Sequence, residues 1–128
     1  MNKIKAMVKQ ISLIIMTVFY VVAGVNHFVH PHSYYVLIPP YLPYPYFINM
    51  ASGVGEIICG ALLIMPATRK AGSTGIIILL ILFIPTHIYM IQKGGCMSAT
   101  SCIPAWVAWV RLFPFQFVLI AWARWFIK

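Results

Sequence analysis

Residues 52–60 read Ser-Gly-Val-Gly-Glu-Ile-Ile-Cys-Gly, and this stretch carries Glu56, the single acidic residue of a 128-residue chain. The residues around it are small or apolar. A charged side chain near the middle of a bilayer costs about 2.5–3.5 kcal/mol on insertion scales, so it is normally paired, turned inward or functional. The rest of the chain can be interpreted as a way of housing this carboxylate, and Arg111 offers a matching cation within an apolar segment.

Composition excludes an ordinary soluble domain. Hydrophobic residues make up 62% of the chain and charged residues 8%, whereas about a quarter of the residues of a soluble domain are charged. The net charge of +8 comes from Lys and Arg scattered at segment ends without a basic stripe, so we expect no nucleic-acid partner. The sequence predicts an integral membrane protein in contact with the lipid bilayer.

Four apolar segments are long enough to cross a bilayer core, which needs about 20 helical residues. We place them at residues 10–29, 47–65, 71–91 and 104–127. The predicted fold is all-α: a polytopic membrane protein with a four-transmembrane-helix bundle, forming one membrane domain over residues 1–128. Pro85 and Pro114 fall inside the third and fourth segments and are expected to kink them.

The positive residues predict the orientation. The first apolar run is long and has no clear small-residue cleavage site, so it is expected to stay as an uncleaved span. The loops 30–46 and 92–103 contain Lys93 as their only Lys or Arg, and the other positive residues lie before the first segment, between the second and third, and at the end of the fourth. By the positive-inside rule both termini are cytoplasmic.

The two outward loops carry different features. Residues 30–46 hold five prolines and five tyrosines, which indicates an extended segment that forms either an interfacial belt or a lid over a cavity. In the other loop Cys96 and Cys102 lie six residues apart on the side expected to be oxidising. We predict a disulfide there, acting as a staple or in exchange with a redox partner. Cys59, within the second segment, is expected to be an inert small hydrophobe.

Several polar residues fall in the outer half of the predicted spans and could meet. Counted from the outer ends, the candidates are Glu56, Arg111, His27, His87 and Asn26. The structural interpretation is a bridge between Glu56 and Arg111 that holds two helices together. The functional interpretation is a ligand or proton site, because buried ion pairs stabilise poorly compared with apolar packing.

A metal site is not predicted. His27, His30 and His32 are close in sequence, but Pro31 interrupts the helix between them. The chain also has no second carboxylate to complete a set of hard ligands.

Five stretches together give the chain a resemblance to a known family. They are Val-Asn-His-Phe-Val-His-Pro-His-Ser-Tyr-Tyr (25–35), Ser-Gly-Val-Gly-Glu-Ile-Ile-Cys-Gly (52–60), Met-Pro-Ala-Thr-Arg-Lys-Ala-Gly (65–72), Ile-Pro-Thr-His-Ile-Tyr-Met (84–90) and Trp-Val-Arg-Leu-Phe-Pro-Phe-Gln (109–116). In order and spacing they resemble the DoxX-like family of small bacterial integral membrane proteins, and the resemblance spans nearly the whole chain.

The resemblance implies a four-helix bundle in the bacterial inner membrane. The family takes its name from subunits of a thiosulfate:quinone oxidoreductase, and some relatives associate with thiol- or superoxide-handling proteins. The motif positions that carry over are His27, Pro31, Glu56, Arg69 and Arg111. The chain departs from the family pattern in two places. Thr-His at positions 86–87 stands where Ala-Asn is expected, and the loop between the two outer cysteines looks peculiar to this branch.

Three functions remain open on the sequence. The first is an accessory or small-lipophile-binding subunit, more a binding protein than an enzyme on its own, with an outward-facing polar pocket around Glu56 and Arg111. The second is a quinone-linked thiol redox subunit, a membrane oxidoreductase component in which Cys96 and Cys102 cycle. The third is a small proton-coupled transporter that requires Glu56 to titrate. A quinone is the one candidate cofactor; a membrane or redox protein partner and a homo-oligomer also stay open.

Overall fold

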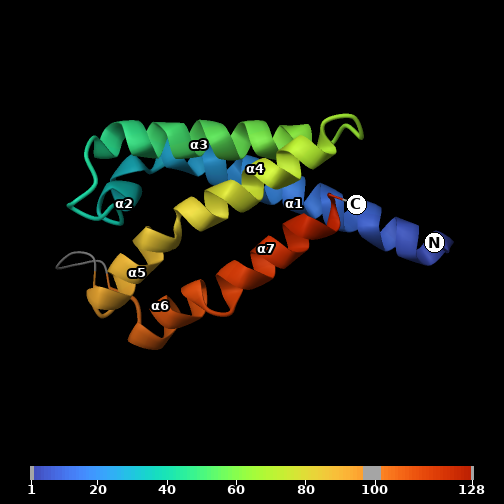
Figure 1. The fold of residues 1–128 in the computed structure, drawn as a ribbon. Helices are drawn as coiled ribbons and strands as arrows, with labels where there is room; N and C mark the ends of the chain where they lie inside the picture. Colours follow the sequence, from blue (N-terminus) through green and yellow to red (C-terminus); the bar gives the residue numbers. More distant parts are fainter. Residues whose placement is uncertain (1, 97–101, 128) are drawn as a thin grey trace.

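The computed structural model describes residues 2–96 and 102–127, and these residues form helices and no strand (Figure 1). Residues 97–101 of the second outward loop, and Lys128 at the end of the fourth predicted segment, lie outside this description. The helices are α1 (Lys3–Val29), α2 (Pro31–Tyr35), α3 (Pro45–Leu62), α4 (Arg69–Leu82), α5 (Ile84–Gln92), α6 (Ala105–Leu112) and α7 (Phe115–Trp125). The prediction of an all-helical chain is confirmed over the described residues.

Three helical stretches are long and apolar enough to cross a membrane: Lys3–Val29, Arg69–Gln92 and Ala105–Trp125. They correspond to the first, third and fourth predicted segments. The second predicted segment corresponds to α3, which is not among these three stretches. It has 18 residues and includes the polar residues Asn49 and Glu56. The first helix begins earlier than its apolar run because Asn2 caps it, accepting a hydrogen bond from the Lys5 amide at 2.8 Å.

Both predicted kinks are confirmed as interruptions. α4 ends at Leu82 and α5 begins at Ile84, so that Phe83 separates them, and Pro85 follows within the first turn of α5. A second interruption lies at residues 113–114, between α6 and α7, where Pro114 precedes the first residue of α7. Proline lacks the amide hydrogen that would continue the helical ladder. The buried Gln116 amide donates to the Leu80 carbonyl at 2.6 Å and so joins α7 to the last turns of α4.

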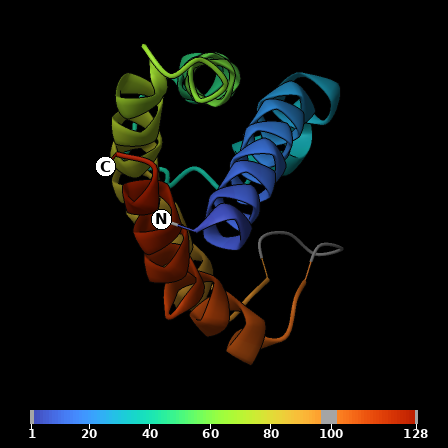
Figure 2. The ribbon, with the colours of Figure 1, turned by 90° about the vertical axis from the view of Figure 1, so that its right-hand side faces the viewer.

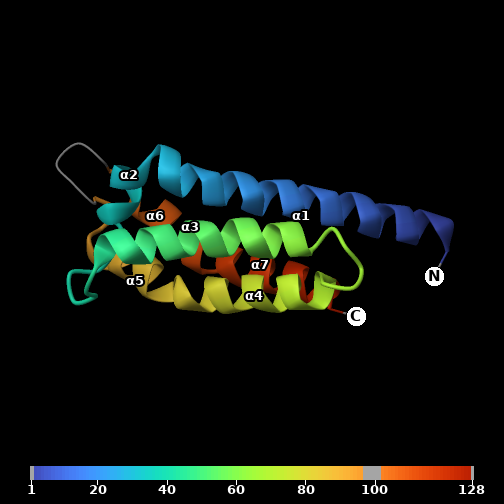
Figure 3. The ribbon, with the colours of Figure 1, turned by 90° about the horizontal axis from the view of Figure 1, so that it is seen from above.

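The helices lie side by side in the order α1, α3, α4, α7, with α5 beside α6 (Figures 1 and 3). Both chain termini lie at one end of the molecule, which we call the terminal end. The short helix α2, together with α5 and α6, lies at the opposite end, which we call the far end (Figure 1).

Glycines let α1 and α3 approach closely. A Cβ atom built on Gly24 of α1 would lie 2.6 Å from the Gly53 carbonyl oxygen, and one on Gly53 would lie 2.8 Å from Cβ of His27. Nearer the terminal end, a Cβ on Gly60 would lie 3.3 Å from the Thr17 carbonyl oxygen. Only glycine fits at the first two positions, so the two backbones pack directly on each other.

The core is concentrated toward the terminal end, where α1 also meets α7. Its buried members are Leu13, Met16, Tyr20, Leu63, Ile76, Leu80, Leu119, Ala123 and Phe126. The Trp122 indole donates to the Ser12 hydroxyl at 2.7 Å, and the Lys9 ammonium lies 5.9 Å from the centroid of the Trp125 ring. Toward the far end α1 stands apart from α6 and α7 (Figure 2). The side-chain contacts between α1 and α7 therefore lie near the terminal end.

A disulfide holds together the chain segments that connect α5 to α6. Cys96 and Cys102 are bonded, with Cα atoms 4.0 Å apart, and the Ile103 amide donates to the Gly95 carbonyl at 2.9 Å. Gly95 has φ +88°, and a Cβ there would collide with the Ile103 carbonyl oxygen. The staple expected from the sequence is thus present, and it brings the end of α5 beside the start of α6.

Candidate functional site: a buried acid-base pair beside an open groove

One face of α3 carries the polar residues that enter the interior. Asn49, Gly53, Glu56 and Gly60 are its buried residues, and their spacing of four, three and four places them on a single stripe. On α1 the matching buried stripe includes Tyr20, Gly24 and His27. The close approach at the glycines brings the polar members of the two stripes into contact.

Glu56 is paired with His27. Oε2 of the carboxylate lies 3.2 Å from Nε2 of the imidazole, and the two residues are 5% and 7% exposed. The distance is that of an ion pair, but the alignment is not that of a hydrogen bond, and Oε2 has no hydrogen-bond partner among the described residues. The two groups are buried against each other, and the described residues place no other charge at the carboxylate.

Asn49 fixes the protonation pattern of the imidazole. Its side-chain amide donates to the His27 carbonyl at 2.9 Å, so its oxygen faces Nδ1 of the same residue at 2.7 Å. An amide oxygen can only accept, and Nδ1 must therefore carry a hydrogen. A neutral imidazole would then present a bare Nε2 to Glu56. Two lone pairs at 3.2 Å repel, so one proton belongs to this contact, on either the imidazole or the carboxyl group.

The pair is connected to the far end through Tyr34 of α2. The Tyr34 ring stacks on the imidazole, with centroids 3.8 Å apart and planes 19° apart. Its hydroxyl accepts a hydrogen bond of 2.6 Å from the Asn26 side-chain amide. Tyr34 therefore covers one face of the imidazole and ties the short helix α2 to α1.

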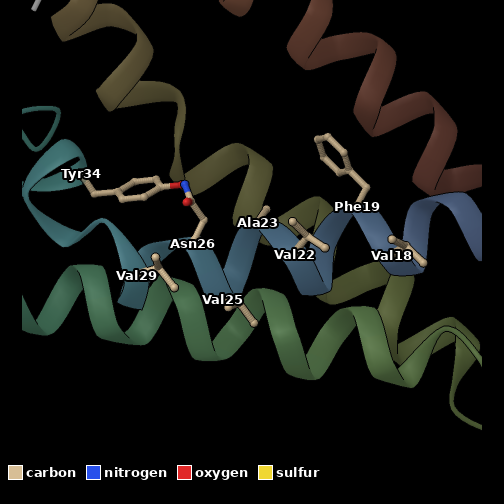
Figure 4. Close-up of a pocket in the computed structure, with 8 residues that line it drawn as sticks. All are labelled: Val18, Phe19, Val22, Ala23, Val25, Asn26, Val29 and Tyr34. Atoms are coloured by element: carbon tan, nitrogen blue, oxygen red, sulfur yellow. The ribbon is translucent and has the colours of Figure 1, made fainter.

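A shallow groove with a volume of about 600 Å³, open along its length, follows one side of α1 (Figure 4). The lining comes from α1 and α2 and is apolar except for Asn26 and Tyr34, which lie at one end: Val18, Phe19, Val22, Ala23, Val25, Asn26, Val29 and Tyr34. Both polar lining residues adjoin His27: Asn26 precedes it in the chain, and the Tyr34 ring stacks on its imidazole. The groove and the acid-base pair thus share one wall.

The structure separates the residues that the sequence suggested as one cluster. Glu56, His27 and Asn26 lie together at the α1–α3 side, but the expected bridge between Glu56 and Arg111 is wrong for the described part of the chain, where the carboxylate's ion-pair partner is His27. Arg111 instead donates to the Met90 sulfur at 3.6 Å and lies within electrostatic reach of His87. The reason is the order of the helices, since α3 packs on α1 and α4, whereas α6 packs on α5 and α7.

Sequence reasoning missed three residues of the site. Asn49 was detectable, because it lies seven residues before Glu56 and so on the same helix face, two turns away. Tyr20 is buried with its hydroxyl unpartnered in the described structure, within electrostatic reach of the carboxylate, and it lies seven residues before His27. Tyr34 carried no local signal, since one tyrosine among five in the loop is selected only by how α2 folds back on α1.

The fold and the site define a helical protein with three helices able to cross a membrane and a buried acid-base pair between α1 and α3. Residues 16–127 match the model of a family described as a domain of unknown function, DUF8561, and the chain belongs to that family. The matched region includes the pair and the groove. Comparisons with curated proteins and with solved structures gave no match.

Proposed function

We propose that the chain is a DoxX-like protein of the bacterial inner membrane that crosses the bilayer four times, with α3 as the second span and both termini cytoplasmic. Three observations support the four crossings and the common side of the termini. Three helices meet the length and hydropathy needed to cross. The 18 residues of α3 span about 27 Å at 1.5 Å each, close to a bilayer core. Both termini lie at one end, where most of the Lys and Arg residues are found.

The proposed function is binding of a small lipophilic molecule in the groove along α1, as an accessory membrane subunit. One observation carries the proposal: the contact of Asn26 with Tyr34 places the polar end of an otherwise apolar groove against His27. A molecule with an apolar body and a hydrogen-bonding head fits this lining. The head would meet Asn26 and Tyr34, and the body would lie along the valines of α1.

The test is mass spectrometry of an organic extract of the protein purified in mild detergent. We expect a small lipophile near one copy per chain. Val25→Trp should remove it, because the side chain fills the groove, while Val54→Trp should not. Both valines are 45% exposed, but Val54 is on α3 outside the groove. Recovery of bulk lipid alone, or equal retention in the two variants, would overturn the proposal.

A second candidate function is a quinone-linked thiol redox subunit, and the observed disulfide between Cys96 and Cys102 favours it. In this case the extracted lipophile is a quinone, which takes two electrons and two protons as the dithiol closes to the disulfide. Reducing the purified protein and adding a soluble quinone should then re-form the disulfide with loss of quinone absorbance. The same mixture made with Cys96→Ser should leave the quinone unchanged.

A further inference from the structure

Arg111 has no counter-ion among the residues that the structure describes. The sequence contains one acidic side chain, Glu56. Its carboxylate is paired with His27, with Oε2 3.2 Å from Nε2 of the imidazole. The hydrogen-bond acceptor that the described structure gives to the Arg111 guanidinium is the Met90 sulfur, at 3.6 Å. A thioether is a weak acceptor, and a guanidinium has five N–H donors in a planar fork. Most of the donor capacity of Arg111 is therefore unused by the chain.

His87 gives the same region a second incomplete polar group. It lies within electrostatic reach of Arg111, and its Nδ1 is buried without a hydrogen-bond partner among the described residues. Burying a polar atom without a partner is unfavourable. The short connection closed by the disulfide holds α5 beside α6, so that these groups stay together. Within the described residues, Arg111 and His87 thus both keep unused hydrogen-bonding capacity, and none of these residues supplies an anion to Arg111.

Arg111 lies within reach of a bilayer interface. It is the seventh residue of α6, about 10 Å along the helix from its start at the far end. Trp106 and Trp109 of the same helix are 67% and 59% exposed. Exposed tryptophans on a membrane protein are typical of the headgroup level. The long side chain of Arg111 can extend its guanidinium from this depth toward the level of the lipid phosphates.

We infer that Arg111 and His87 bind the phosphate group of a phospholipid between α5 and α6, at the far end of the molecule. The guanidinium pairs with two phosphate oxygens, as its planar fork allows, and His87 completes the anion site. The acyl chains extend along the outer surface of α6, past the exposed tryptophans. This site rests on the membrane placement proposed above and is independent of the groove, because its residues come from other helices.

The experiment is native mass spectrometry and thermal unfolding of the full chain in non-ionic detergent, titrated with phosphatidylglycerol. We expect about one tightly bound lipid and a raised unfolding temperature. Arg111→Gln should weaken binding about fivefold or more, as expected for one basic residue at a lipid surface. Arg111→Lys, which keeps the charge, should retain part of the binding and guards against a folding defect in the first variant.

Lys93→Gln is the matched control, since it also removes one positive charge, at the C-terminal end of α5. It should change lipid binding by less than twofold. Equal weakening by the Lys93 and Arg111 variants would show diffuse attraction and overturn the site.

Two further arms identify the ligand. Diacylglycerol with the same chains should not stabilise the protein, and neither should inorganic phosphate. If inorganic phosphate stabilised the protein and Arg111→Gln abolished this effect, the ligand would be a free anion, and the proposal of a phospholipid would be overturned. The groove variant Val25→Trp should bind phosphatidylglycerol normally, so the two proposals fail separately.

Discussion

Glu56 and His27 are both more than nine-tenths buried, and neither can lose its partner without leaving an incompletely paired polar group inside the molecule. Asn49 commits Nδ1 of the imidazole as a donor, so the contact with the carboxylate holds one proton. A proton retained at a buried contact next to a groove lined by Asn26 and Tyr34 is suited to respond to a hydrogen-bonding ligand.

Replacing the carboxylate should show whether polarity matters at this position. We expect Glu56→Leu to lower the free energy of unfolding by about 3–5 kcal/mol, because it leaves His27 buried without its partner. Glu56→Gln should cost less than half as much, since a neutral amide can donate to Nε2 of a neutral imidazole. Reversible unfolding in mixed micelles, followed by tryptophan fluorescence, measures both. Equal losses would mean that only side-chain volume counts here.

The coupling of the two residues is a separate prediction. In a double-mutant cycle of Glu56→Leu and His27→Phe, the combined loss should be smaller than the sum of the single losses by about 2 kcal/mol, within the range seen for residues in contact. Phenylalanine keeps a ring for Tyr34 to stack on. The free energies of unfolding of the four proteins give the coupling, and additive losses would contradict the pair.

At the scale of elements, the α1–α3 contact depends on the absence of side chains at two positions. Gly24→Ala should lower the free energy of unfolding by about 1–3 kcal/mol, because its Cβ would lie 2.6 Å from the Gly53 carbonyl oxygen and the helices must separate. Gly55→Ala, on the side of α3 that faces α4, is the control. Its Cβ would lie 3.4 Å from a Leu79 methyl group, an ordinary contact, so it should be neutral or slightly stabilising. Thermal unfolding in detergent compares them, and a similar loss in both would refute the close-packing argument.

The α4–α7 contact includes one polar side chain among its apolar residues. Gln116→Leu should remove the bond to the Leu80 carbonyl and lower the free energy of unfolding by about 0.6–1.7 kcal/mol, the range found for hydrogen bonds between membrane helices. Gln92→Leu, at the end of α5, is a control of the same chemistry without that bond. Unfolding of the two variants under identical conditions makes the comparison. No difference between them would show that Gln116 does not join the helices.

At the scale of the whole molecule, the disulfide and the contacts between α1 and α7 close opposite ends of the structure. Cys96→Ser with Cys102→Ser should lower the free energy of unfolding by about 2 kcal/mol, from the chain entropy of a short closed loop. Under the accessory function, retention of the groove ligand should be unchanged in this double variant. Extraction and mass spectrometry of the double variant against wild-type protein tests this, and loss of the ligand would favour the redox function.

The helical segments were predictable because apolar runs of about 20 residues leave the backbone few alternatives to a helix in a membrane. Pro85 and Pro114 marked the interruptions for the same local reason, the missing amide hydrogen. The buried face of α3 followed from the spacing of Glu56 and its glycines. The partner of Glu56 did not follow, because both Arg111 and His27 lie at a suitable depth in the sequence.

The sequence by itself determined the composition of the site: one acid, few bases, small residues on the acid's face and two cysteines in a short loop. Tertiary structure decided which of these residues meet. Depth along a helix can be counted from the chain, but the neighbours of a helix depend on how backbones pack, and here the fit of Gly24 against Gly53 brought α1 rather than α6 to Glu56. That choice paired Glu56 with His27 and left the charge of Arg111 without an anion from its own chain.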